Sequence, residues 1–268
     1  MTLHEPLLRA PDARARIRFA VLPLLLATTA VTACGRIPGN FEILQNQVPQ
    51  PGCLISADEG NAYRGQGILD LQLVRPGATS AYYIFPLVKN NMPGSTGGGP
   101  DANEVDVHSF AVDIGPSPQG TMPAQVQSLF DTLNSAPGSN DYALLHYSLP
   151  WAVTIASGGG TAATLVGGFP VDLASRVLTT GAIGVSPQSL LLNVQVRVFG
   201  TTNTQDIESD PFDYPLYVCA GCLIGNLLPC PFASAGNTGN ECNVAQDNTV
   251  DCCSLNGELI CPPLVGAQ

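Results

Sequence analysis

The chain has 268 residues and carries 10 Lys and Arg against 21 Asp and Glu, a net charge of −11 at pH 7. Such an acidic surface repels phosphate backbones and anionic headgroups, which argues against nucleic-acid binding and against electrostatic attachment to a membrane. Frequent glycine and proline, sparse charge and short runs of Val, Leu, Ile and Thr favour a folded protein of strands and turns over a disordered one.

Residues 1–33 have the features of a signal peptide. Four arginines are followed by an apolar stretch at 19–33, which is shorter than the roughly 20 residues that a spanning helix needs. Without this segment the chain keeps 6 Lys and Arg against 19 Asp and Glu, so its net charge becomes −13. The arginines are Arg9, Arg14, Arg16 and Arg18.

The apolar stretch ends in Val31-Thr32-Ala33-Cys34, which resembles the lipobox of bacterial lipoproteins. The resemblance implies that Cys34 receives a diacylglyceryl group and becomes the first residue of the mature chain. The acyl chains would then hold the protein on the membrane durably. Gly35, in place of an Asp after the cysteine, implies the outer membrane. We expect partners to be the membrane, through the lipid, and an unidentified protein or glycan.

Next we expect a tether at 34–52, which holds Cys34 and three prolines, and then a β-sandwich domain at 53–218. Apolar alternation and β-branched or aromatic runs predict strands, and Pro86 marks an edge or a bend. In 104–114 the alternation changes phase, which indicates a bulge or mixed burial. The predicted strands are 67–74, 81–88, 104–114, 141–149, 190–199 and 212–218.

Two segments of this domain have helical rather than strand spacing. In 121–134 the apolar residues fall at helical intervals, with Thr121 as a cap and Pro123 early in the helix. Residues 171–178 predict another short helix. The fold class is therefore mainly β: an immunoglobulin-like sandwich, or alternatively a jelly roll, with one or two short helices.

Residues 219–268 predict a small disulfide-rich module. Seven cysteines lie here, and fifty residues bury too little apolar surface to be stable without cross-links. An even set of eight cysteines besides Cys34 predicts four disulfides, with Cys53 bonded to one of the seven and Cys252 and Cys253 in different bridges. The eight candidates are Cys53, Cys219, Cys222, Cys230, Cys242, Cys252, Cys253 and Cys261.

The cysteine pattern of this tail also resembles a known group. The pattern C-x2-C-L, then Q-D-x3-D-C-C and a final C-P, is similar to the ending of uncharacterised lipoproteins of myxobacteria. The resemblance implies localisation only, because no activity is attached to that group.

Several residues fit known chemistry, but each also fits a structural role. Cys219-Ala220-Gly221-Cys222 fits a redox motif, or half a zinc site completed by Cys230 and Cys242, but an exported protein favours disulfides. His108 and His146 lie in predicted strands, where packing or surface roles are commoner. Trp151, which follows Pro150, is expected to be a core or rim aromatic rather than a sugar-binding platform. Two acidic loops offer oxygen ligands for calcium but lack EF-hand spacing. The loops are Asp101, Asn103, Glu104 and Asp106, and Asp247, Asn248 and Asp251.

These observations predict a lipid-anchored envelope protein with a non-enzymatic structural or binding role, no catalytic residues, no cofactor and no metal. The alternatives are a hydrolase whose site assembles only in the fold, or a redox or metal-binding protein that uses the cysteine module.

Overall fold

A computed structural model describes residues 40–75, 77–94, 101–183, 189–203, 205–228, 230, 237–255 and 258–261. The predicted signal peptide and Cys34 therefore lie outside the described residues, as does most of the glycine-rich loop at 93–100. The described residues all belong to one compact unit. Among the described residues, no helix has the length and apolarity needed to cross a membrane.

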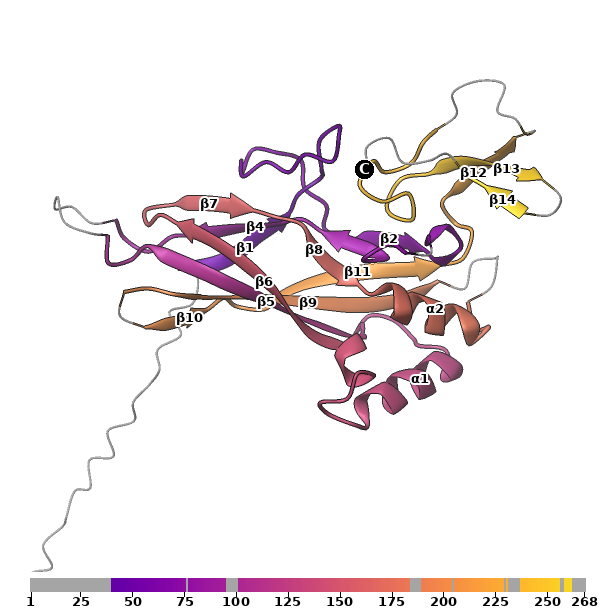
Figure 1. Cartoon of the computed structure of the whole chain (residues 1–268), viewed down its shortest axis with the longest axis horizontal. Coiled ribbons are helices and arrows are strands. Elements are labelled where there is room, and N and C mark those ends of the chain that lie inside the picture. The colour runs from indigo at the N-terminus through magenta and orange to yellow at the C-terminus, as the bar shows by residue number, and fades with distance from the viewer. Residues whose placement is uncertain are drawn as a thin grey trace, which may run out of the picture. The chain divides into compact units, whose positions relative to one another are not determined.

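The main sheet is built from long antiparallel strands (Figure 1). Its strand order is β2-β11-β9-β5-β6, and β10 (Asp206–Glu208) pairs with β9. All neighbours are antiparallel except β2 and β11, which run parallel. The strands are β2 (Gly67–Asp70), β5 (Val105–Pro116), β6 (His146–Ile155), β9 (Leu190–Thr201) and β11 (Phe212–Cys219).

Strand β9 confirms the clearest sequence prediction. Its residues alternate strictly between buried and half-buried along the whole strand. Every second residue from Leu190 to Val198 is apolar and faces the core, and Asn193, Gln195 and Arg197 lie on the other face. This period of two is what a sheet with one buried face requires.

Strand β5 contains the predicted bulge. Its pairing register with both neighbours shifts between Val107 and Ser109, so His108 is the extra residue. A bulge reverses the alternation of the side chains that follow it. Val105 and Val107 before the bulge and Phe110 after it therefore all reach the core.

Two smaller sheets pack against the main one. One has the order β1-β4-β7 and the other pairs β3 with β8 (Figure 1). A single hydrophobic cluster joins residues of β1, β3, β4 and β8 to those of β5, β9 and β11, which confirms a mainly β fold of packed sheets. The strands are β1 (Phe41–Asn46), β3 (Tyr82–Ile84), β4 (Pro86–Asn90), β7 (Gly160–Ala163) and β8 (Val166–Phe169).

The segment predicted as a tether, 34–52, contains a strand. Residues 41–46 form β1, antiparallel to β4, with Phe41 and Ile43 buried. The prolines that suggested a tether lie outside this strand, and the short alternation of Phe41, Glu42 and Ile43 is the local signal for it.

Two other predicted strands are interrupted. Tyr82–Ile84 and Pro86–Asn90 are separate strands, so Pro86 does mark a break. The strand predicted at 67–74 ends at Asp70, and Leu71–Leu73 form a 3-10 helix, η1. The Asp70 carboxylate accepts the Gln72 amide at 3.0 Å and so caps this turn.

Both predicted helices are present. α1 (Ala124–Asn134) buries Val126, Phe130 and Leu133, and its N-cap position is Pro123, not Thr121. α2 (Val171–Thr179) buries Leu173, Ala174 and Val177. The 3-10 helix η2 (Tyr142–Leu144) replaces the first half of the strand predicted at 141–149, which begins at His146.

The C-terminal residues contain strands β12 (Ile224–Leu228), β13 (Val250–Leu255) and β14 (Glu258–Ile260). The eight cysteines form four disulfides, as predicted, and Cys53 is bonded to Cys242. Val244, Ala245 and Val250 belong to the same hydrophobic cluster as the packed sheets. This disulfide-rich segment is thus continuous with the sandwich core. The other pairs are Cys219–Cys222, Cys230–Cys253 and Cys252–Cys261.

Candidate functional site

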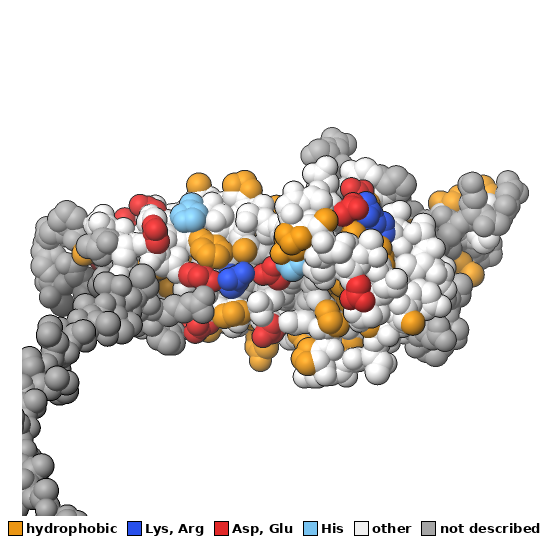
Figure 2. All heavy atoms as spheres, turned by 90° about the horizontal axis from the view of Figure 1, so that it is seen from below, with side chains coloured by type: hydrophobic (Ala, Val, Ile, Leu, Met, Phe, Trp, Pro, Cys, Tyr) orange, Lys and Arg blue, Asp and Glu red, His pale blue; other side chains and the backbone are white. Residues whose placement is uncertain are grey.

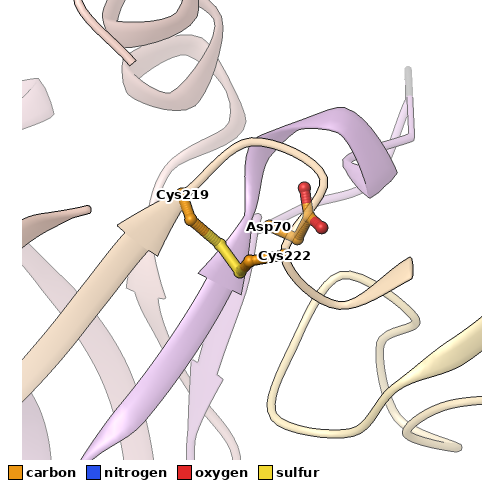
Figure 3. A group of neighbouring side chains, drawn as sticks. All are labelled: Asp70, Cys219 and Cys222. Atoms are coloured by element: carbon orange, nitrogen blue, oxygen red, sulfur yellow. A yellow bond between two sulfur atoms is a disulfide. The ribbon is translucent and has the colours of Figure 1, made fainter. Parts of the chain in front are cut away.

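The loop after β11 brings two cysteines and a buried carboxylate together (Figure 3). Cys219 ends β11 and pairs with Asp70 at the end of the parallel strand β2. Gly221 has a φ of 83°, a left-handed conformation that glycine adopts without strain, and it turns the chain so that Cys222 returns to Cys219. The ligand atoms of Asp70, Cys219 and Cys222 all lie within 4.8 Å of one another.

The Asp70 carboxylate holds this loop by accepting backbone amides. Its Oδ1 accepts the Gly221 N–H at 2.7 Å and the Gln72 N–H at 3.0 Å, and its Oδ2 accepts the Leu223 N–H at 2.8 Å. A carboxylate offers about four lone-pair sites, so three are occupied here. Asp70 is fully buried, and these bonds compensate its loss of hydration.

Because Cys219 and Cys222 are bonded to each other, their sulfurs are not thiolates, which are the form of cysteine that binds metal. Cys230 and Cys242, the other half of the zinc alternative, are bonded to Cys253 and Cys53, so they are not thiolates either. Among the described residues, Asp70, Cys219 and Cys222 form the one group of potential metal ligands that converges.

A second polar site lies beside the Cys53–Cys242 disulfide. A hollow of about 170 Å³ is lined by the loop at 48–51, by Arg64 and by residues 239–241 and 248. Arg64 has a half-buried side chain, and its Nε lies 3.6 Å from Oδ2 of the buried Asp247. Prolines 49 and 51 form an apolar wall, and Glu241 adds a carboxylate, so the hollow has groups of both charges.

Asp247 connects Arg64 to two buried tyrosines. Its carboxylate accepts the Ile68 amide at 3.0 Å and the Tyr82 hydroxyl at 3.0 Å, and the Tyr82 and Tyr214 hydroxyls lie 2.9 Å apart. Burial raises the pKa of Asp247, although the Ile68 amide and the Arg64 charge oppose the shift. Burial, followed by the Asp247 charge, also raises the pKa of both tyrosines.

A third cluster lies on the outer face of the main sheet. His146 Nδ1 is 2.7 Å from Asp113 Oδ1, and Arg197 donates to Asp113 Oδ2 at 3.0 Å and to Glu208 at 2.8 Å. Partial burial alone would lower the pKa of Arg197, but the hydrogen bonds to Glu208 and Asp113 outweigh it and raise that pKa. His146 Nε2 lies 2.8 Å from Asn134 Oδ1, so both ring nitrogens are engaged.

Figure 2 views the molecule from below and shows hydrophobic side chains scattered among polar and charged ones, with a basic side chain between acidic ones.

His108 lies on the β5 bulge, with Nδ1 2.9 Å from the hydroxyl of its neighbour Ser109. Trp151 stacks on the buried Phe110 with ring centroids 4.9 Å apart, which is the packing role that the sequence favoured.

The acidic loops are held by local hydrogen bonds. Asp101 accepts the Ser157 hydroxyl at 2.5 Å and the Asn103 amide at 3.1 Å, and these bonds lower its pKa. Asp251 accepts the Asn237 amide at 2.8 Å, which lowers its pKa too. Within each loop, the carboxylates of the described residues have different partners and form no converging ligand set.

Sequence reasoning missed Asp70, Arg64 and the Tyr82–Tyr214 pair. Asp70 binds the Leu223 amide across 153 residues, and Tyr82 meets Asp247 across 165. One local pattern could have indicated Asp70: it directly precedes the turn at Leu71–Leu73, and Asp is a preferred residue at such a capping position.

No protein-family model, curated protein or solved structure matches the chain.

Proposed function

We propose that the protein is a lipid-anchored lipoprotein of the bacterial cell envelope, held in the outer membrane by Cys34, with a non-enzymatic structural or binding role. The observation that carries the proposal is the position of the ninth cysteine. The eight others are used in four disulfides, and Cys34 follows the Val31-Thr32-Ala33 segment directly.

The four disulfides support an extracytoplasmic location, because such bonds persist in oxidising compartments. The engaged nitrogens of His146 favour a structural or binding role over hydrolysis by this residue, since both lie within hydrogen-bond distance of Asp113 and Asn134. The hollow around Arg64 could bind a small ligand, because Arg64 supplies a cation and Glu241 a carboxylate in its lining.

The test is the intact mass of the protein extracted with detergent from cells expressing the full chain, alkylated without reduction. We expect a chain that begins at Cys34, carries acyl mass and has no alkylated thiol. The matched control is the Cys34→Ala variant, which should lack acyl mass while keeping its four disulfides.

A wild-type chain without lipid, or one in which Cys34 is alkylated, would refute the anchor. Hydrolysis of generic ester or peptide substrates by the extracted wild-type protein, abolished by His146→Ala, would refute the non-enzymatic role.

A further inference from the structure

We propose that Cys219–Cys222 is an exchangeable disulfide, a site where an external protein dithiol reduces this chain reversibly while the fold stays intact. The inference concerns the CxxC loop alone and does not depend on the lipid anchor.

The first argument is access. Cys222 is the one exposed residue among the eight bonded cysteines, whereas its partner Cys219 is 8 % exposed. Thiol–disulfide exchange requires a thiolate to reach one sulfur directly. Cys252 and Cys253 are buried, and the remaining cysteines are at most half exposed, so Cys222 is the bonded cysteine that solvent reaches most.

The second argument is that this bond constrains the chain least. Its cysteines are 3 residues apart, against 9, 23 and 189 for the other pairs. The entropy that a disulfide removes from the unfolded chain grows with the length of the loop it closes. Opening Cys219–Cys222 therefore leaves the three bonds with longer loops to stabilise the fold.

The third argument is that the loop stays in place without the bond. Asp70 holds the amides of Gly221 and Leu223 at 2.7 and 2.8 Å, and Cys219 remains paired with β2. In the reduced state the Cys219 thiol has an acceptor, because its Sγ lies 3.4 Å from the Leu69 carbonyl oxygen. The two sulfurs thus remain positioned to close again.

The exchange takes place in two steps. A thiolate of the dithiol attacks Cys222 Sγ and forms a mixed disulfide, while the Cys219–Cys222 bond breaks and its electron pair leaves on Cys219, which takes up a proton. The second thiolate of the partner then displaces Cys222, which is protonated in turn. The partner loses two electrons and two protons and becomes a disulfide, and Cys219 and Cys222 become two thiols.

The first experiment is graded reduction of the folded, full-length protein with dithiothreitol in the absence of denaturant, followed by alkylation and peptide mass spectrometry. We expect Cys219 and Cys222 to be labelled together before any other cysteine, with an unchanged circular dichroism spectrum, and oxidised dithiothreitol to restore the bond. Earlier opening of another pair, or opening only together with unfolding, would overturn the proposal.

The second experiment compares two single variants that each leave one thiol. In Cys219→Ala the free Cys222 should react with 5,5′-dithiobis(2-nitrobenzoate) on the order of tenfold faster than the free Cys219 of Cys222→Ala, because reactivity follows access. Equal rates, a faster Cys219, or failure of both variants to fold would show that the bond is structural and the proposal wrong.

Discussion

The Cys53–Cys242 disulfide closes a loop between residues 189 positions apart. In the chain-entropy treatment a loop of this length stabilises the folded state by about 5 kcal/mol at 25 °C. Cys53 and Cys242 are only half-buried, so replacing both with alanine removes little packing from the core. The loss should therefore come from the greater freedom of the unfolded chain.

The matched control is the double variant Cys219→Ala/Cys222→Ala, which opens a loop of separation 3. The same treatment gives about 2 kcal/mol for this loop. For a chain of this size about 5 kcal/mol corresponds to a fall in Tm of about 10–20 °C, and the control should fall by less than half of that.

The assay is urea unfolding of both variants and the wild type, followed by circular dichroism under non-reducing conditions. We expect the free energy of unfolding of Cys53→Ala/Cys242→Ala to lie about 3 kcal/mol below that of the control. Equal losses in the two variants, or a larger loss in the control, would refute the argument from loop length.

Three further predictions concern the buried polar groups. Gly67→Ala should destabilise the protein by about 2 kcal/mol, because a Cβ there would collide with the Tyr82 hydroxyl. Its control, Gly65→Ala, places a Cβ with nothing within 4 Å and should change the unfolding free energy by about 0.5 kcal/mol or less. Similar losses for the two variants in urea unfolding would contradict this. Burial raises the pKa of Tyr82 and Tyr214 above the ordinary 10.0, so the stability they contribute is complete below pH 10 and is lost as the pH rises through the folded values. The unfolding free energy should be lower at about pH 11 than at about pH 8, and equal values at the two pH values would refute this linkage. Asp70→Ala should lower the unfolding free energy by at least about 2 kcal/mol, because three backbone amides lose their acceptor, and a loss below about 0.5 kcal/mol in the same assay would contradict it.

Local patterns could be predicted from the sequence, and pairings between distant segments could not. The alternation in 190–199 predicted β9, and the pattern in 104–114 indicated a bulge or mixed burial in β5, because both depend on neighbouring residues alone. The even number of cysteines predicted four disulfides, but spacing could not choose Cys242 as the partner of Cys53.

Where short-range signals competed, the prediction was wrong. Residues 67–74 alternate as a strand should, and Leu69, Leu71 and Leu73 are all buried, yet the Asp70 side chain ends the strand by capping the next turn. The site around Arg64 and Asp247 depends on a tyrosine 165 residues from Asp247. No periodicity or local motif carries that information.

The early start of β1 restricts where a lipid-anchored form of this protein could act. Phe41 is already buried in the core, and it follows Cys34 by seven residues. Even fully extended, seven residues span only about 25 Å. With Cys34 acylated, the point where the chain enters the fold would lie within that distance of the bilayer surface. A binding partner would therefore have to come close to the membrane, because a linker of this length would not let the folded domain move far from the bilayer surface.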